Sequence, residues 1–161
     1  MISLLSHFPK YLVRILIETT GLFRRGMTIG ARVIVLNDKG QVLLVRHSYL
    51  KGWYLPGGGI DPGETAGEAA AREVLEEAGV RATEPPELLG LFLNKRGMGR
   101  DHVALYVLRD WEPTDVYLLP NREILEADFF DHGQLPEDVT DATRARLDEF
   151  SKGKLPTSSY W

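Results

Sequence analysis

The stretch GGGIDPGETAGEAAAREVLEEAGV, which runs from Gly57 to Val80, constrains the fold more than any other part of the chain. Its first part is rich in glycine and proline, which favours a tight loop. The remainder predicts a helix from Ala66 to Ala78. Thr65 and Glu68 form a capping-box pattern at the helix start, and Gly79 suits the position just past its end. A glycine-rich loop therefore leads directly into a glutamate-rich helix.

A helical wheel at about 100° per residue divides this helix into two faces of different chemistry. The face expected to lie against a sheet is small and apolar and comprises Gly67, Ala71, Val74 and Ala78. The other face gathers three carboxylates, those of Glu73, Glu76 and Glu77. Like charges at this spacing destabilise a helix by roughly 0.2–0.5 kcal/mol per pair, and the nearby cations are Arg72 and Arg81 alone.

Three carboxylates that converge without enough cations suit a hard divalent ion, since Mg²⁺ prefers oxygen ligands and keeps several waters. The glycine loop then has a purpose, because glycine lets the backbone approach both an ion and phosphate groups closely. The alternative interpretation is an acidic, solvated helix that follows a flexible loop. The loop is neither a P-loop nor a dinucleotide-binding fingerprint, because the residues that follow it do not fit either spacing.

The rest of the chain predicts a single α/β domain over residues 26–161. Apolar, β-branched runs indicate strands at 31–36, 41–46, 88–94, 102–111 and 126–131, with a short strand near Trp53 that breaks at Pro56. A second helix is expected from Asp141 to Ser151, with Thr140 as its cap and Gly153 after its end. A mixed β-sheet with helices on both faces is the natural architecture for this order of elements.

Residues 1–25 form a separate segment in this interpretation. Apolar residues recur at helical spacing after Pro9, which predicts an amphipathic helix. Such a helix packs on the domain or on a sister subunit, which makes a homodimer an expected partner arrangement. The alternative is contact with a membrane surface, helped by Lys10, Arg14, Arg24 and Arg25.

Composition excludes several classes of protein. The formal net charge of −4 argues against a protein that coats nucleic acid, because such domains carry a basic surplus. The chain has no cysteine, so disulfides, thiolate nucleophiles and cysteine zinc sites are excluded. We expect a cytoplasmic protein, because the chain lacks both a good signal peptide and a window of about 18 uninterrupted apolar residues.

The loop and helix together carry a longer pattern. It runs from Gly58 through five residues to Glu64, then through seven residues to Arg72-Glu73-Val74-Leu75-Glu76-Glu77-Ala78-Gly79-Val80. This matches the Nudix box at every defining position, and the chain resembles the Nudix hydrolases. The stretches LLVRHSYLKGWYLPGGGIDPGET and NREILEADFFDHGQLP are also similar to members of this superfamily.

The resemblance implies a Nudix-type α/β/α sandwich, with a mixed sheet between helices. It implies hydrolysis of a diphosphate bond in a nucleoside diphosphate derivative, with Mg²⁺ or Mn²⁺ as the cofactor. The matching metal-binding positions are Glu73, Glu76, Glu77 and the carbonyl of Gly57. Arg72 matches the arginine that holds a box glutamate in place, and the positions that match structural support are Gly58, Glu64 and Gly79.

A carboxylate must take the proton from the attacking water, and the family leaves its identity open. It is either a box glutamate, Glu73 or Glu76, or an acid from a loop outside the box. The outside candidate is Glu123, which precedes the last predicted strand, with Glu126 and Asp101 as further alternatives.

Substrate recognition is less defined by the sequence. The cations placed where they could meet phosphates are Arg46, Lys51, Arg96 and Arg100. The aromatic residues available to stack on a base are Trp53, Tyr54, Phe92 and Tyr106, although aromatics in strands often belong to the core. His47 and His102 are interpreted as polar residues at strand ends.

Three functional hypotheses follow. The first is a metal-dependent pyrophosphohydrolase acting on ADP-ribose, another nucleotide sugar or a nucleoside triphosphate. The second is a nucleotide-sensing binding module that keeps the fold, and the third is the same hydrolase tethered to a membrane by residues 1–25. The partner in each case is a small nucleotide, with no stable nucleic-acid binding.

Overall fold

The computed structural model describes residues 26–95 and 99–161, so the helix expected within 1–25 lies outside the described residues. The strands are β1 (Thr28–Val35), β2 (Val42–His47), β3 (Val80–Ala82), β4 (Glu87–Asn94), β5 (Asp101–Leu108), β6 (Trp111–Pro113), β7 (Ile124–Phe130) and β8 (Ser158–Tyr160). The helices are α2 (Ala66–Ala78), the short 3₁₀ helix η2 (His132–Gln134) and α3 (Asp141–Ser151).

The central sheet is mixed and has the strand order β1-β5-β4-β8. β1 runs parallel to β5, β4 is antiparallel to β5, and β8 is parallel to β4. Two further antiparallel pairs form, β2 with β7 and β3 with β6. The short strand expected near Trp53 is present only as isolated bridges, Val45 with Tyr54 and Trp53 with Val139.

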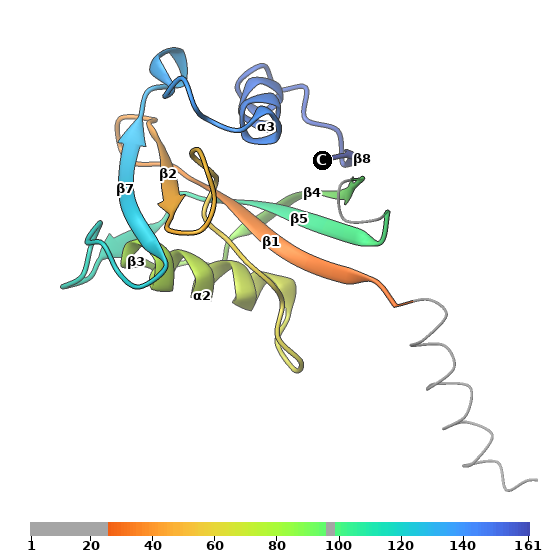
Figure 1. Ribbon diagram of the computed structural model, residues 1–161, viewed down its shortest axis with the longest axis horizontal. Coiled ribbons are helices and arrows are strands. Elements are labelled where there is room, and N and C mark those ends of the chain that lie inside the picture. The colour runs from red at the N-terminus through yellow and green to blue at the C-terminus, as the bar shows by residue number, and fades with distance from the viewer. Residues whose placement is uncertain (1–25, 96–98) are drawn as a thin grey trace, which may run out of the picture.

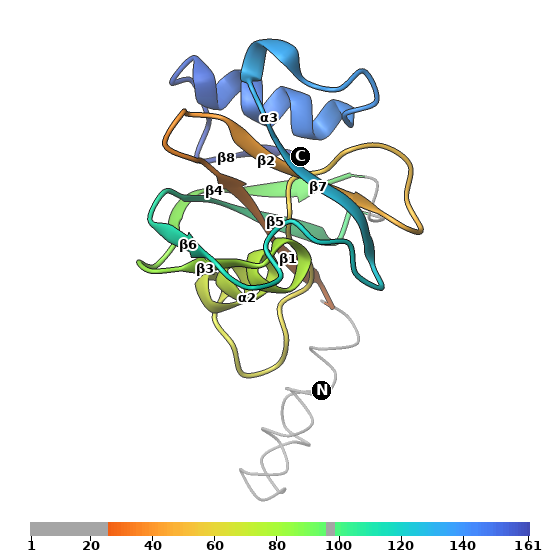
Figure 2. The ribbon, with the colours of Figure 1, turned by 90° about the vertical axis from the view of Figure 1, so that its left-hand side faces the viewer.

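The two helices cover opposite faces of this sheet, as Figures 1 and 2 show. Alternation along β5 explains why there are two cores. Ala104 and Tyr106 belong to one cluster with Val74 of α2, whereas Leu105 belongs to a second cluster with Leu147 of α3. The predicted α/β/α sandwich with a mixed sheet is therefore confirmed.

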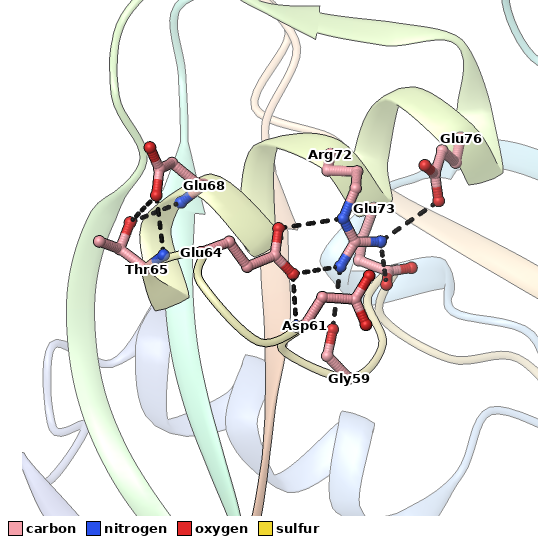
Figure 3. Close-up of polar contacts among 8 residues, drawn as sticks. All are labelled: Gly59, Asp61, Glu64, Thr65, Glu68, Arg72, Glu73 and Glu76. Carbon is pink, nitrogen blue, oxygen red and sulfur yellow. Dashed lines mark hydrogen bonds and ion pairs between the residues drawn. The ribbon is translucent and has the colours of Figure 1, made fainter.

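Both predicted helices have the bounds that the sequence indicates. The Thr65 side chain accepts a hydrogen bond from the Glu68 backbone N–H, and the Glu68 side chain accepts one from the Thr65 backbone (Figure 3). Thr140 caps α3 through the Thr143 backbone N–H. None of the helices within the described ranges is long and apolar enough to cross a bilayer.

The buried face of α2 differs from the face that the wheel predicts. Ala69, Ala70, Val74, Glu77 and Ala78 are the buried residues, whereas Gly67 and Ala71 stay partly exposed. The helix is turned so that the Glu77 side chain lies beneath the glycine loop, where it accepts a hydrogen bond from the backbone of that loop. One of the three predicted metal ligands is thus part of the interior.

Candidate active site

The glycine loop lies along β1, to which it is hydrogen bonded. The backbone N–H of Ala31 donates to the Gly58 carbonyl at 2.9 Å, and the backbone N–H of Val33 donates to the Pro56 carbonyl at 2.9 Å. Gly58 also lies against the carboxylate of Glu73, because a Cβ at this position would meet the Glu73 Oε1 atom at 2.5 Å. Gly58 therefore lets the carboxylate contact the loop backbone directly.

Arg72 clamps the loop to the helix, as Figure 3 shows. Its Nε and Nη2 atoms donate to the two carboxylate oxygens of Glu64 at 3.1 and 2.6 Å. Nη1 donates to Glu73 at 2.7 Å and to the exposed Glu76 at 3.3 Å, and Nη2 also donates to the Gly59 carbonyl at 3.0 Å. Hydrogen bonding by Arg72 holds the pKa of Glu64 below its usual range. One guanidinium thus connects three of the box glutamates.

Glu77 is the buried carboxylate of the site, with 6% of its surface exposed. Its Oε2 atom accepts a hydrogen bond from the Gly57 backbone N–H at 2.8 Å. Burial raises the pKa of Glu77 to about 7, the hydrogen bond from Gly57 and the charge of Arg32 oppose this, and the charges of Glu73 and Glu123 add to it. Burial also raises the pKa of Glu73, although Arg72 opposes that shift.

His47, the last residue of β2, lies beside Glu77. Its Nε2 atom is 3.7 Å from the Glu77 Oε1 atom, and both side chains are buried. Burial and the charge of Arg32 lower the pKa of His47. His47 thus ends a strand, as the sequence indicates, but its burial beside the site was not predicted. The alternation of Leu43, Val45 and His47 along one strand was the available signal.

A turn at residues 121–124 brings a fourth acid to the site. Asn121 Nδ2 donates to the backbone carbonyl of Glu76 at 2.9 Å, while its Oδ1 atom accepts from the backbone N–H groups of Glu123 and Ile124 at 2.9 and 2.8 Å. The turn and α2 enclose a pocket of about 340 Å³, which we call the acidic pocket. It is lined by Glu73, Glu76, Glu77, Asn121, Arg122, Glu123 and Ile124.

The other two acids considered as bases lie in different surroundings. Glu126 pairs with Arg46 at 3.2 Å. Asp101 accepts hydrogen bonds from the Thr28 hydroxyl at 2.8 Å and from the Asn94 amide at 2.9 Å. Of the three acids proposed from outside the Nudix box, Glu123 is the one that lines the acidic pocket.

Arg32 of β1 connects the glycine loop to a second cavity. Its Nη1 atom donates to the carbonyls of Gly57 and Leu55. It also lines a cavity of about 460 Å³ on the α3 side of the sheet, which we call the α3 cavity. The polar and aromatic residues around this cavity include Arg32, Tyr54, Asn94, Thr140, Asp141, Arg146, Tyr160 and Trp161. Sequence reasoning missed Arg32 and Asn121, because neither is part of the box.

The cations predicted to meet substrate do not gather at the acidic pocket. Arg46 is paired with Glu126 and lines a surface pocket of about 650 Å³ together with Lys51. Arg100 is exposed just before β5, and Arg96 lies outside the described residues. Of the four aromatic candidates, Trp53, Phe92 and Tyr106 are buried in the core clusters, whereas Tyr54 lines the α3 cavity.

Within residues 26–95 and 99–161, the His, Asp and Glu side chains form no group of three that is already arranged to hold a metal ion. Arg72 engages Glu73 and Glu76, while the loop backbone engages Glu77. The donor set nevertheless fits a hard cation. It consists of carboxylate oxygens that share one pocket, and burial raises the pKa of the buried member, Glu77.

A family model described as NUDIX domain matches residues 26–150. The chain belongs to the Nudix family. Its fold is similar to the crystal structure of a NUDIX hydrolase from Nitrosomonas europaea, with a TM-score of 0.69 and 23% identity over 84% of this chain and 78% of that one.

Two curated relatives of this Nudix chain have functional names. One is a Bacillus subtilis protein provisionally named an 8-oxo-dGTP diphosphatase, which is 58% identical over 55 residues, or 34% of this chain and 37% of the relative. The other is diphosphoinositol polyphosphate phosphohydrolase 2 of Rattus norvegicus, which is 47% identical over 80 residues, or 47% of this chain and 44% of the relative. The matches thus span less than half the length of each relative.

Proposed function

We propose that this chain is a divalent-metal-dependent Nudix pyrophosphohydrolase that cleaves a diphosphate bond in a nucleoside diphosphate derivative. The observation that carries the proposal is the acidic pocket. It collects Glu73, Glu76 and Glu77 of the box with Glu123, and it holds a buried carboxylate whose pKa is raised. A perturbed pKa in a pocket is typical of functional sites, whereas an ordinary solvated helix would keep its carboxylates exposed.

Glu73, Glu76 and Glu77 are the residues that would hold Mg²⁺ or Mn²⁺, with the second lone pair of the Gly57 carbonyl oxygen as a further ligand. When bound, the metal offsets the charge of the diphosphate and lowers the pKa of a water. Arg72 fixes Glu73 and Glu64, so the carboxylates and the loop keep their positions as substrate binds. This positioning is worth much of the rate enhancement in phosphoryl-group chemistry.

Glu123 is our choice for the group that takes the proton from the attacking water. It lines the acidic pocket and comes from outside the box helix, on a turn that Asn121 ties to α2. A general base must lie within hydrogen-bond reach of the proton that it removes, directly or through one water. Glu126 and Asp101 do not line the acidic pocket, and they are paired with Arg46 and with Thr28 respectively, which favours Glu123.

The α3 cavity is our choice for the part of the substrate that lies beyond the diphosphate. Arg32 connects it with the glycine loop, and Tyr54, Tyr160 and Trp161 supply aromatic surface for a base. The names of both relatives indicate substrates that contain linked phosphate groups, but the rest of the substrate differs between them. Nucleoside triphosphates, 8-oxo-dGTP, ADP-ribose and nucleotide sugars are therefore the first substrates to assay.

The test is product release from a panel of these substrates with Mg²⁺ and with Mn²⁺. We expect one substrate class to turn over, and Glu77→Gln and Glu123→Gln each to lower kcat at least about a hundredfold. Glu126→Gln is the matched control, because it changes a nearby exposed acid of β7 and should retain turnover. Tight nucleotide binding without hydrolysis of any substrate would instead identify a nucleotide-sensing module.

A further inference from the structure

His47 has an unmet requirement for hydrogen bonds inside the candidate active site. Its side chain is 3% exposed, and neither Nδ1 nor Nε2 has a hydrogen-bond partner among the described residues. Buried polar groups in folded proteins almost always have a partner, so this exception calls for an explanation. An apolar side chain of similar size would fill the same space without leaving a polar atom unsatisfied.

The local fold aims this imidazole at the site. The β2–β7 ladder shifts register between Arg46 and His47, so that His47 stands opposite Ile124 and Leu125 is passed over. Such bulges commonly redirect side chains next to functional sites. The imidazole also packs near two aromatic rings, with centroid distances of 5.3 Å to Tyr49 and 5.5 Å to Tyr54. Its position is therefore confined on several sides.

The group that His47 faces is the buried carboxylate. His47 Nε2 lies 3.7 Å from Glu77 Oε1, slightly beyond hydrogen-bond range, while Glu77 Oε2 accepts from the Gly57 backbone N–H. The His47 imidazole and the Gly57 N–H thus face different oxygens of the Glu77 carboxylate. A neutral imidazole carries one N–H, and the tautomer with its proton on Nε2 closes this pair after a small shift.

We propose that His47 is a positioning residue that fixes the Glu77 carboxylate for a divalent cation. The inference rests on the proposed function, because Glu77 needs fixing only if the acidic pocket binds metal. A carboxylate that accepts one hydrogen bond on each oxygen keeps further lone pairs for a cation. Loss of a partner that orients a metal ligand typically weakens metal binding or activity by about 10- to 100-fold.

The experiment measures Mn²⁺ binding to the full chain without substrate, by electron paramagnetic resonance of the free ion. His47→Leu should raise the Mn²⁺ dissociation constant at least about tenfold. His47→Gln should stay within about threefold of the original chain, because the glutamine amide reaches the position of Nε2. His47→Asn, whose amide reaches only the position of Nδ1, should behave like His47→Leu.

A second measurement separates positioning from packing. In EDTA, His47→Leu should melt at the same temperature as the original chain or higher, since it removes unsatisfied polar atoms from the interior. Loss of metal affinity without loss of stability is not expected from a residue that only fills space. His132→Leu is the control for replacing a histidine with leucine away from the acidic pocket. His132 is exposed and pairs with Asp148 on the α3 side of the sheet.

The outcomes distinguish the two proposals. If Glu77→Gln binds Mn²⁺ as well as the original chain, the proposed metal site is wrong and the role of His47 falls with it. If Glu77→Gln loses binding while His47→Leu binds within about twofold of the original chain, only the role of His47 is overturned. That role is also overturned if His47→Gln and His47→Asn bind Mn²⁺ equally, and this comparison holds even if the leucine variant does not fold.

Discussion

At the scale of single residues, Arg72 connects several parts of the site at once. It binds Glu64 through two parallel hydrogen bonds and also reaches Glu73, Glu76 and the loop backbone. This requires the planar fork of a guanidinium, which an ammonium group cannot reproduce. We therefore expect the shape of this side chain to matter more than its charge.

We expect Arg72→Lys to lower kcat about 10- to 100-fold, because lysine keeps the charge but cannot hold Glu64 and Glu73 together. Steady-state turnover at saturating Mg²⁺ checks this. Arg81→Lys is the matched control, since Arg81 makes an exposed ion pair with Glu112 at 3.1 Å, and it should leave kcat unchanged. Equal activity of both variants would show that charge alone suffices at position 72.

The raised pKa of Glu77 predicts how the stability of the metal-free protein depends on pH. Its pKa in the folded state, about 7, lies above the ordinary value of 4.5, so the folded state binds this proton more tightly than the unfolded chain does. The contribution to stability is fully present below pH 4.5 and is lost as the pH rises through 7. By linkage the loss amounts to roughly 3 kcal/mol.

The measurement is the free energy of unfolding in urea between about pH 4.5 and 8, in EDTA, for the original chain and for Glu77→Gln. The difference between the two should change by about 3 kcal/mol across this range, with the original chain becoming relatively less stable at high pH. The comparison with Glu77→Gln is needed because burial lowers the pKa of His47, so that the contribution of His47 to stability changes with pH in the opposite direction. A pH-independent difference would contradict the burial of an ionisable Glu77.

At the scale of elements, α2 has a strong cap at each end. The capping box at Thr65 satisfies backbone donors at the start, and Gly79 adopts a left-handed φ of 64° at the end, with its N–H bonded to the Leu75 carbonyl at 3.0 Å. The capping box at Thr65 decides where the helix begins relative to the glycine loop. The register of the three box glutamates depends on that starting point.

We expect Thr65→Ala to lower the free energy of unfolding by about 1 kcal/mol, because it removes the side-chain acceptor for the Glu68 backbone N–H. Thr65→Ser keeps that acceptor and should lose much less. Urea denaturation of both variants tests the pair. Similar stability for alanine and serine would mean that packing against the sheet, rather than the cap, fixes the helix start.

The elements also show what the sequence could and could not predict. Capping residues specify helix ends locally, so the bounds of α2 and α3 followed from Thr65, Gly79 and Thr140. The short strands β3, β6 and β8 have three residues each and carry no readable period, so the sequence did not predict them. Their pairing is set by tertiary contacts.

The distinction between features set by local sequence and features set by tertiary contacts also applies to the candidate active site. The box glutamates lie on one helix, and local spacing was enough to group them. The contacts of His47, Asn121 and Arg32 join segments far apart in the chain, and a single sequence does not contain that information. The rotation of α2 that buries Glu77 was also unpredictable from a wheel, because a glutamate is rarely placed on an interior face.

At the scale of the whole molecule, a bound cation should stabilise the fold. A ligand that binds only the folded state at about a hundred times its dissociation constant adds about 2.7 kcal/mol. For a domain of this size that corresponds to an increase in Tm of about 5–10 °C. Calorimetry with Mn²⁺ and with EDTA measures the shift, and Glu77→Gln should abolish it. An equal shift in both proteins would indicate binding elsewhere.

The parallel pairing of β1 with β5 has a consequence for how the chain reaches this fold. Thr28 stands opposite Asp101, 73 residues later, and the register continues to Val35 opposite Leu108. This pair of strands therefore cannot form on a ribosome until both of them have left the exit tunnel. Because closing so long a loop precedes any gain from the pairing, we expect slow folding and a nascent chain that needs protection from aggregation.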